Sequence, residues 1–132
     1  MKETILLYNF TSPKVRNAIK SIAIQMGVHI RTVEPEQYQM PLGLLAFGSK
    51  EDQKDYLVAD CQPFEDSMLI FAGLTNQRLN QFLKLMSKNK VPRIALKATL
   101  TEHNAVWNSV AFHDELVKEH EFMTGENGRK ES

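Results

Sequence analysis

The chain has 132 residues, 42% hydrophobic and 24% charged, and its 16 basic side chains balance its 16 acidic ones. This length suits one domain with a buried core, and the composition excludes a disordered, collagen-like or low-complexity chain. The single cysteine, Cys61, excludes an intrachain disulfide and a multi-cysteine metal cluster built by one chain. The longest apolar run, residues 68–74, is far shorter than a membrane span, and the first residues lack the pattern of a signal peptide. We therefore expect a cytoplasmic protein with no membrane contact.

Charge is distributed in blocks along the chain. Residues 1–33 carry a net charge of +4, residues 34–66 of −6, residues 67–101 of +6 and the remainder of −4. Such blocks can neutralise one another within the fold or across a homodimer, and they can also bind a charged partner.

The first structural pattern lies in residues 1–33. An apolar strand at residues 5–8 leads to Ser12, which can cap a helix, and to Pro13, which suits the first turn of that helix. An apolar stripe of helical spacing follows, and Gly27 ends it. Residues 28–33 then alternate like a half-exposed strand.

The second pattern repeats the first after a shift of 63 to 64 residues. A strand at residues 68–71 leads to Thr75 as a helix cap, an apolar stripe covers residues 79–86, and residues 94–100 alternate as a strand. The sequence therefore predicts a β-α-β unit used twice.

Residues 34–66 form a long acidic connection between the two units. Its first half can hold a short helix broken near Pro41 and Gly43. Its second half, residues 48–66, is weakly patterned, and we interpret it as a mobile excursion.

The chain ends in a predicted helix and a polar tail. Ser109 is the expected cap of a helix over residues 110–122, and residues 124–132 are expected to be disordered. We predict one α/β domain over residues 1–123, in which the first unit, the connection and the second unit with its helix occupy residues 1–33, 34–66 and 67–122.

Two sheet topologies agree with this pattern, because in both the apolar strands are central and the alternating strands lie at the edges. A ferredoxin-like sheet has strand order 4-1-3-2, and a short doubly wound parallel sheet, as in flavodoxin-like folds, has 2-1-3-4. The duplication favours the ferredoxin-like order.

Motifs for catalysis or cofactor binding are missing from the sequence. It contains no glycine-rich phosphate loop. The strand-to-helix junctions at residues 9–12 and 73–76 leave open a small-anion or nucleotide-binding enzyme or regulator. His113 and His120 are seven residues apart, too far for one metal ion, and the acids around Cys61 disfavour a reactive thiolate. We predict no catalytic residue, no metal site and no cofactor.

Nucleic-acid binding is a second alternative. Ferredoxin-like RNA readers stack bases on aromatic residues of the central strands, where this chain has Tyr8, Phe10 and Phe71. The aromatic-basic signature of those readers is missing and the net charge is zero, so nucleic acid is not the expected partner. An enzyme would be favoured by a deep cleft that holds His29 or His103 beside a carboxylate.

One stretch carries a family resemblance. Residues 96–107 read L-K-A-T-L-T-E-H-N-A-V-W, and residues 115–120 read E-L-V-K-E-H. This pattern resembles that of an uncharacterised bacterial family catalogued as domain of unknown function 3783, over residues 68–122. The sequence departs from it by inserting residues 93–95 between a proline and the L-K-A motif. The resemblance implies no catalytic residues, cofactor or substrate.

Within this stretch, four residues form a candidate interaction site: Lys97, Thr101, Asn104 and Trp107. Thr101 can cap the next turn, Asn104 can tie the backbone of that turn, and Trp107 can anchor the last helix to the sheet. Lys97 is either an exposed edge residue, a docking charge, or a cation paired with Glu115 or Glu119, and we expect the pair. We predict a non-enzymatic binding or interaction module, with a homo-oligomer or another protein as partner through exposed strand edges.

Overall fold

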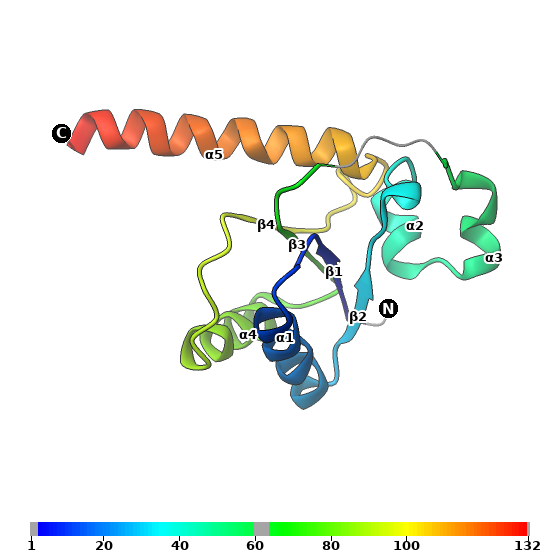
Figure 1. Cartoon of the computed structure of the whole chain (residues 1–132), viewed down its shortest axis with the longest axis horizontal. Helices are drawn as coiled ribbons and strands as arrows, with labels where there is room; N and C mark the ends of the chain where they lie inside the picture. The colour runs from blue at the N-terminus through cyan, green and yellow to red at the C-terminus, as the bar shows by residue number, and fades with distance from the viewer. Residues whose placement is uncertain (1–2, 60–63, 132) are drawn as a thin grey trace.

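The computed structural model describes the backbone of residues 3–59 and 64–131, and the side chains of the same ranges up to residue 121. Within these ranges the chain forms a four-stranded sheet and five α-helices (Figure 1). The elements in chain order are β1 (Thr4–Tyr8), α1 (Pro13–Met26), β2 (His29–Thr32), the 3-10 turn η1 (Pro35–Gln37), α2 (Leu42–Phe47), α3 (Lys50–Gln53), the 3-10 turn η2 (Lys54–Tyr56), β3 (Met68–Ala72), α4 (Asn76–Lys88), β4 (Leu96–Thr99) and α5 (Ser109–Glu131).

The sheet has the strand order β2-β1-β3-β4. β1 pairs in parallel with β2, β3 pairs in parallel with β4, and the central β1 and β3 are antiparallel. The predicted ferredoxin-like order 4-1-3-2 is therefore wrong. Each crossover helix joins two neighbouring strands, so each β-α-β unit keeps its own pair together and the units meet through their first strands. The order 2-1-3-4 is found, but in a mixed sheet and not in a parallel one.

The register of the central strands shows that the two units are related by a local two-fold axis. Leu6 pairs with Ile70, its equivalent after the 64-residue shift. Ile5 pairs with Phe71, which is equivalent to Leu7, and Leu7 pairs with Leu69, which is equivalent to Ile5. The axis therefore passes through the Leu6–Ile70 pair. It places α1 and α4 in contact on one face of the sheet.

The predicted helix starts of both units, and the predicted stop of the first helix, are confirmed. The Ser12 side chain accepts a hydrogen bond from the Val15 N–H, with Pro13 in the first turn of α1. Gly27 ends α1 in the left-handed conformation at φ 72°. In the second unit the Thr75 hydroxyl caps α4.

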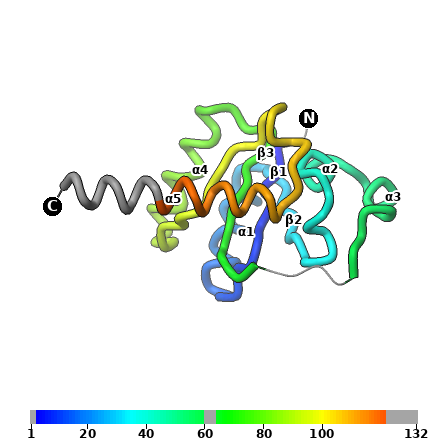
Figure 2. The backbone as a smooth tube through the Cα atoms, turned by 90° about the horizontal axis from the view of Figure 1, so that it is seen from above, coloured from blue at the N-terminus to red at the C-terminus, as the bar shows by residue number. Residues whose placement is uncertain are grey.

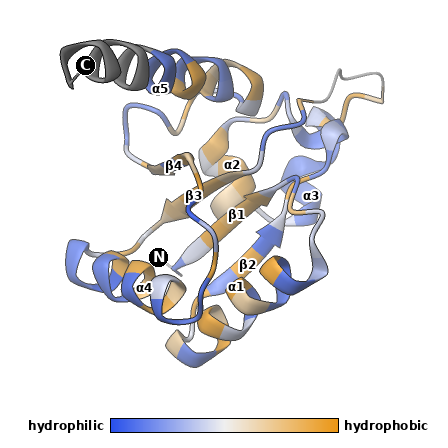
Figure 3. Cartoon of the chain, turned by 60° about the vertical axis from the view of Figure 1, so that its left-hand side comes forward, coloured by the Kyte–Doolittle hydropathy of each residue, from blue (hydrophilic) through white to orange (hydrophobic). Residues whose placement is uncertain are grey.

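Each face of the sheet carries its own hydrophobic core. α1 and α4 cover one face, and α2 and α5 cover the other (Figure 1). The central strands β1 and β3 are buried along their length and mostly apolar, as expected for strands that are covered on both faces (Figure 3). The α1/α4 face buries Ile5, Leu7, Ile19, Ile22, Leu69, Phe71 and Phe82, and the α2/α5 face buries Leu6, Tyr8, Tyr38, Met40, Leu42, Leu45, Met68, Ile70 and Phe112.

The acidic connection is more helical than predicted. α2 begins after Pro41, and Gly43 lies inside this helix and does not break it. A Cβ atom at Gly43 would lie 3.3 Å from that of Ala105, so the missing side chain permits close packing against the segment before α5. α3 and η2 occupy part of the stretch predicted as an irregular excursion, and residues 60–63 of that excursion lie outside the described residues.

The last helix begins on a different cap from the predicted one. The Asn108 side chain accepts from the Ala111 N–H, whereas Ser109, the predicted cap, is the first helical residue and is fully buried. α5 lies across the sheet (Figure 2) and its backbone continues to Glu131. The disorder predicted for residues 124–132 stays a prediction, and Ser132 lies outside the described residues. In the part of the chain that the structure describes, no helix is long and apolar enough to cross a membrane.

Candidate functional site

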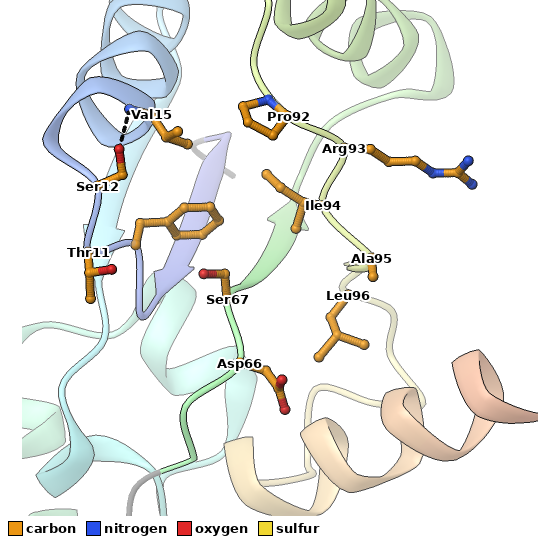
Figure 4. Close-up of a pocket in the computed structure, with 11 residues that line it drawn as sticks. Thr11, Ser12, Val15, Asp66, Ser67, Pro92, Arg93, Ile94, Ala95 and Leu96 are labelled. Atoms are coloured by element: carbon orange, nitrogen blue, oxygen red, sulfur yellow. Dashed lines mark hydrogen bonds between the residues drawn. The ribbon is translucent and has the colours of Figure 1, made fainter. Parts of the chain in front are cut away.

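A cleft of about 350 Å³ opens at the end of the sheet where β1 stops and α1 begins (Figure 4). Its walls come from the β1–α1 junction, from the residues before β3 and from the segment that leads into β4. They are mostly apolar, with Phe10, Val15, Ile94 and Leu96, and Ser67 adds a hydroxyl group. Both β-α-β units thus contribute to one hollow.

The local two-fold axis gives this cleft a counterpart at the opposite end of the sheet, and an ion pair lies at that counterpart. There, the Arg78 guanidinium donates to the Glu3 carboxylate at 2.9 Å and to the Met26 carbonyl at 2.6 Å. The hydrogen bond from Arg78 and its charge lower the pKa of the Glu3 carboxyl. An ion pair thus joins the two units at one end of the duplicated fold, while the equivalent end holds the cleft.

Most polar groups around the open cleft are engaged within the fold or point out of it. The Ser67 hydroxyl donates to the Asn9 carbonyl at 2.9 Å, and the Ser12 hydroxyl caps α1. The Arg93 side chain points away from the cleft, and Asp66 points towards α5 (Figure 4). The centre of the cleft is therefore apolar and carries no cation.

Asp66 connects the cleft to α5 through a buried histidine. His113, 7% exposed, has Nε2 2.8 Å from Asp66 Oδ2 and Nδ1 3.2 Å from Asp114 Oδ1. Its ring stacks on Phe64 with centroids 3.9 Å apart. Because both ring nitrogens face carboxylates, His113 holds residues 64–66 against the helix. His113 is thus buried in the fold, whereas His120 is exposed.

Asn9 fastens the same segment from the other side. It has a left-handed backbone, with φ 61°, and its side-chain amide donates to the Phe64 carbonyl at 2.7 Å and to the Asp66 carbonyl at 3.1 Å. Sequence reasoning placed Asn9 in a possible anion-binding junction. The structure shows that its side chain instead holds the segment before β3, which forms one wall of the cleft.

The aromatic residues of the central strands are covered. Tyr8 is 0% exposed and Phe71 is 2% exposed, so neither ring can stack on a base. The Tyr8 hydroxyl lies 2.7 Å from the Ser109 hydroxyl, and burial raises the pKa of Tyr8. Phe10 is half-buried and lines the cleft.

Thr101 and Asn104 form a closed turn after β4. The Thr101 N–H donates to Asn104 Oδ1 at 2.8 Å, and the Asn104 N–H donates to the Thr101 hydroxyl at 3.2 Å. The Asn104 amide also donates to the Thr99 carbonyl at 3.1 Å, which occupies an outward-facing acceptor of edge strand β4. Trp107 packs edge-on against Phe112, and its carbonyl accepts from the Leu42 N–H. This corner joins β4, α2 and α5.

Lys97 lies apart from that corner. It lines a groove beside α4, on the face of the sheet opposite α5, so the expected pair with Glu115 or Glu119 is wrong. Its ammonium group donates to the Ile94 carbonyl at 2.6 Å. Burial, and to a lesser extent the charge of Arg93, lower its pKa. The four candidate residues therefore do not form one site.

The remaining chemical candidates give no further cluster. Among the described residues, no three His, Cys, Asp or Glu side chains are placed to hold a metal ion. His29 and His103 are exposed, and neither lines the cleft. Cys61 lies outside the described residues. Sequence reasoning did not identify the Asp66–His113 contact, for which an acid before a strand and a histidine on the apolar margin of a helix were the available signals.

Comparison with known protein families gives a match for a segment in the second half of the chain. Residues 67–123, from the residue before β3 into α5, match the family model described as domain of unknown function (DUF3783). This confirms the resemblance stated above for a segment that covers less than half of the chain. No curated protein and no solved structure matches the chain.

Proposed function

We propose that this protein is a non-enzymatic binding module that takes a small apolar group, neutral or positively charged, in the cleft at the end of the sheet. The asymmetry of the duplicated fold carries this proposal. The Arg78–Glu3 pair joins the two units at one of the two equivalent ends, and the other end is an open hollow lined by both units.

The size and lining of the cleft support a small apolar ligand. Its volume of about 350 Å³ falls at the lower end of the range of ligand pockets, roughly 300–1,000 Å³. Burial of apolar ligand surface against Phe10, Val15 and Ile94 would supply the binding free energy. Asp66 points towards α5, but its side chain is 60% exposed at the rim of the cleft, so its carboxylate favours a positive charge on the ligand over a negative one.

The same geometry argues against the alternative of an anion-binding enzyme or regulator. An anion at the start of α1 would lie near the Asp66 carboxylate, and the Arg93 guanidinium points away. The hydroxyl groups of Ser12 and Ser67 serve as a helix cap and as a donor to the backbone. We therefore assign both serines structural roles.

Titration with three indole probes tests the proposal. Indole is neutral, tryptamine is its cationic derivative and indole-3-acetate its anionic derivative. We expect tryptamine to bind most tightly and indole-3-acetate least, with amide chemical-shift changes around residues 10–15 and 92–96 in NMR spectra.

A matched pair of variants localises the binding. Ala95 is exposed at the cleft, so Ala95→Phe should fill the hollow and weaken tryptamine binding by at least about tenfold, or about 1.4 kcal/mol. Ala111→Phe places the same side chain on the exposed side of α5 and should leave binding unchanged. Tightest binding of indole-3-acetate would support the anion-binding alternative, and equal affinities for the two variants would contradict the cleft as the site.

A further inference from the structure

A second hollow, which shares Pro92, Arg93 and Ile94 with the cleft, lies between the end of α4 and the segment before β4. This groove has a volume of about 320 Å³ and apolar walls that include Leu83, Met86 and Val91. Arg93 and Lys97 stand at the same groove. It belongs to the block of residues 67–101, which contains six basic residues and no acidic one. The groove therefore combines an apolar lining with positive charge.

The acidic connection presents a surface of the complementary kind. α3 and the turn after it project from the body of the molecule, at the end away from α4 in both views (Figures 1 and 2). At the end of η2, three consecutive apolar side chains are exposed, which we term the apolar tip: Tyr56 at 46%, Leu57 at 52% and Val58 at 40%. A backbone hydrogen bond of 3.0 Å from Val58 to the Glu36 carbonyl holds the tip in place.

Acidic side chains flank the apolar tip. Glu51, Asp52 and Asp55 are all exposed on the same projection. Lys54 offsets part of this charge through a surface contact of 3.6 Å with Glu51. Lys50 on α3 is exposed as well, so the projection keeps a small excess of acidic over basic groups. An exposed apolar cluster rimmed by charged groups marks an interaction surface.

We propose that the apolar tip of one copy of this chain docks in the basic groove of a second copy. Tip and groove match in both properties: apolar side chains meet apolar walls, and the carboxylates of the projection meet Arg93 and Lys97. The Lys97 ammonium uses one hydrogen for the Ile94 carbonyl, so it has donors left for a carboxylate. Net charges of −6 and +6 on the two blocks supply long-range attraction between copies.

The position of the two surfaces decides the form of the assembly. Because α3 and α4 lie at different ends of the molecule, one contact leaves a free tip on one copy and a free groove on the other (Figure 1). A contact of this kind is head-to-tail, and repeated from copy to copy it builds a ring or an open chain. This inference is independent of the ligand proposed for the cleft.

Mass measurements on single variants test whether the tip and groove are needed. By light scattering across a concentration series, we expect the mean mass of the wild type to rise with concentration and to fall with added salt, since charge is screened over about 8 Å at physiological ionic strength. Leu57→Ser and Arg93→Glu should each stay monomeric. Ile24→Ser, at a side chain 81% exposed on α1, and Lys84→Glu on α4 are matched controls that should associate like the wild type.

Mixing the two variants that are expected to stay monomeric provides the decisive measurement. Leu57→Ser keeps its groove and Arg93→Glu keeps its tip, so an equimolar mixture should form a one-to-one dimer and nothing larger. Thermal unfolding of each variant checks that the substitution leaves the fold intact. A wild type that is monomeric throughout the series, controls that fail to associate, or a mixture that stays monomeric would each overturn the proposal.

Discussion

At the scale of single residues, the position of Lys97 in β4 decides which face of the sheet its side chain lies on. The alternation of β4 was predicted correctly, and it sends Lys97 to the face opposite Leu96. The error lay in assigning α5 to the face that Lys97 occupies. Strand alternation is a local property, whereas the face that a later helix covers depends on contacts between distant parts of the chain.

Lys97→Met tests this corrected environment. The substitution keeps the apolar stem and removes a charge that has the Ile94 carbonyl as its hydrogen-bond acceptor. We expect the free energy of unfolding at neutral pH to change by less than about 0.5 kcal/mol, measured by urea denaturation. A loss of several kcal/mol would indicate a buried ion pair after all.

The pH dependence of the same variant has a defined sign. The pKa of Lys97 is lowered in the folded protein, so the unfolded chain keeps its proton to higher pH. The stability of the wild type relative to Lys97→Met should therefore rise as the pH approaches the ordinary lysine value of about 10.4. A relative stability that falls over this range would contradict the lowered pKa.

At the scale of elements, the helix caps and the helix stop that depend on neighbouring residues were predicted correctly from the sequence. The cap at Ser12, the stop at Gly27 and the cap at Thr75 act within a few residues, and all three are confirmed. At the start of α5 two adjacent residues could serve as cap. Sequence reasoning chose Ser109, but Asn108 is the cap because Ser109 forms a buried bond to Tyr8, which is 101 residues away in sequence.

Substitutions at Ser109 and Asn108 should show that the two side chains have different hydrogen-bond partners. Ser109→Ala leaves the buried Tyr8 hydroxyl without this bond and should lower the free energy of unfolding by about 1–3 kcal/mol. Adding Tyr8→Phe should restore part of that loss, because no polar group of the pair then remains. Asn108→Ala should cost about 1 kcal/mol as the loss of a helix cap.

The control for this comparison is Asn108→Ala combined with Tyr8→Phe. Cap and tyrosine do not bond to each other, so the two effects should add. Additive effects for Ser109→Ala with Tyr8→Phe would show that the hydroxyl pair contributes no coupling.

At the scale of the whole molecule, the duplicated β-α-β unit accounts for the fold, and the difference between the two ends of the sheet defines the candidate site. The repeat of 63 to 64 residues was visible in the sequence, and it predicted two β-α-β units. The way in which the units join was not visible, because pairing of β1 with β3 involves residues about 64 positions apart. The cleft depends on this pairing, and neither unit forms it alone. The sequence therefore predicted the parts of the fold but not the hollow between them.

The end of the fold that holds the Arg78–Glu3 pair offers the sharpest test of this asymmetry. Arg78→Met removes the cation that bonds to Glu3 and to the Met26 carbonyl. Because both side chains are partly exposed, we expect a small loss in the free energy of unfolding at neutral pH, while Arg93→Met, at an exposed arginine, should have even less effect. The Glu3 pKa lies below its ordinary value of 4.5 in the folded wild type, so this contribution is present above pH 4.5 and is lost as the pH falls through the folded-state pKa. The stability difference between the wild type and Arg78→Met should therefore shrink in acid. A difference that stays constant down to the acid unfolding of the protein would show that Arg78 acts through packing and not through its ion pair with Glu3.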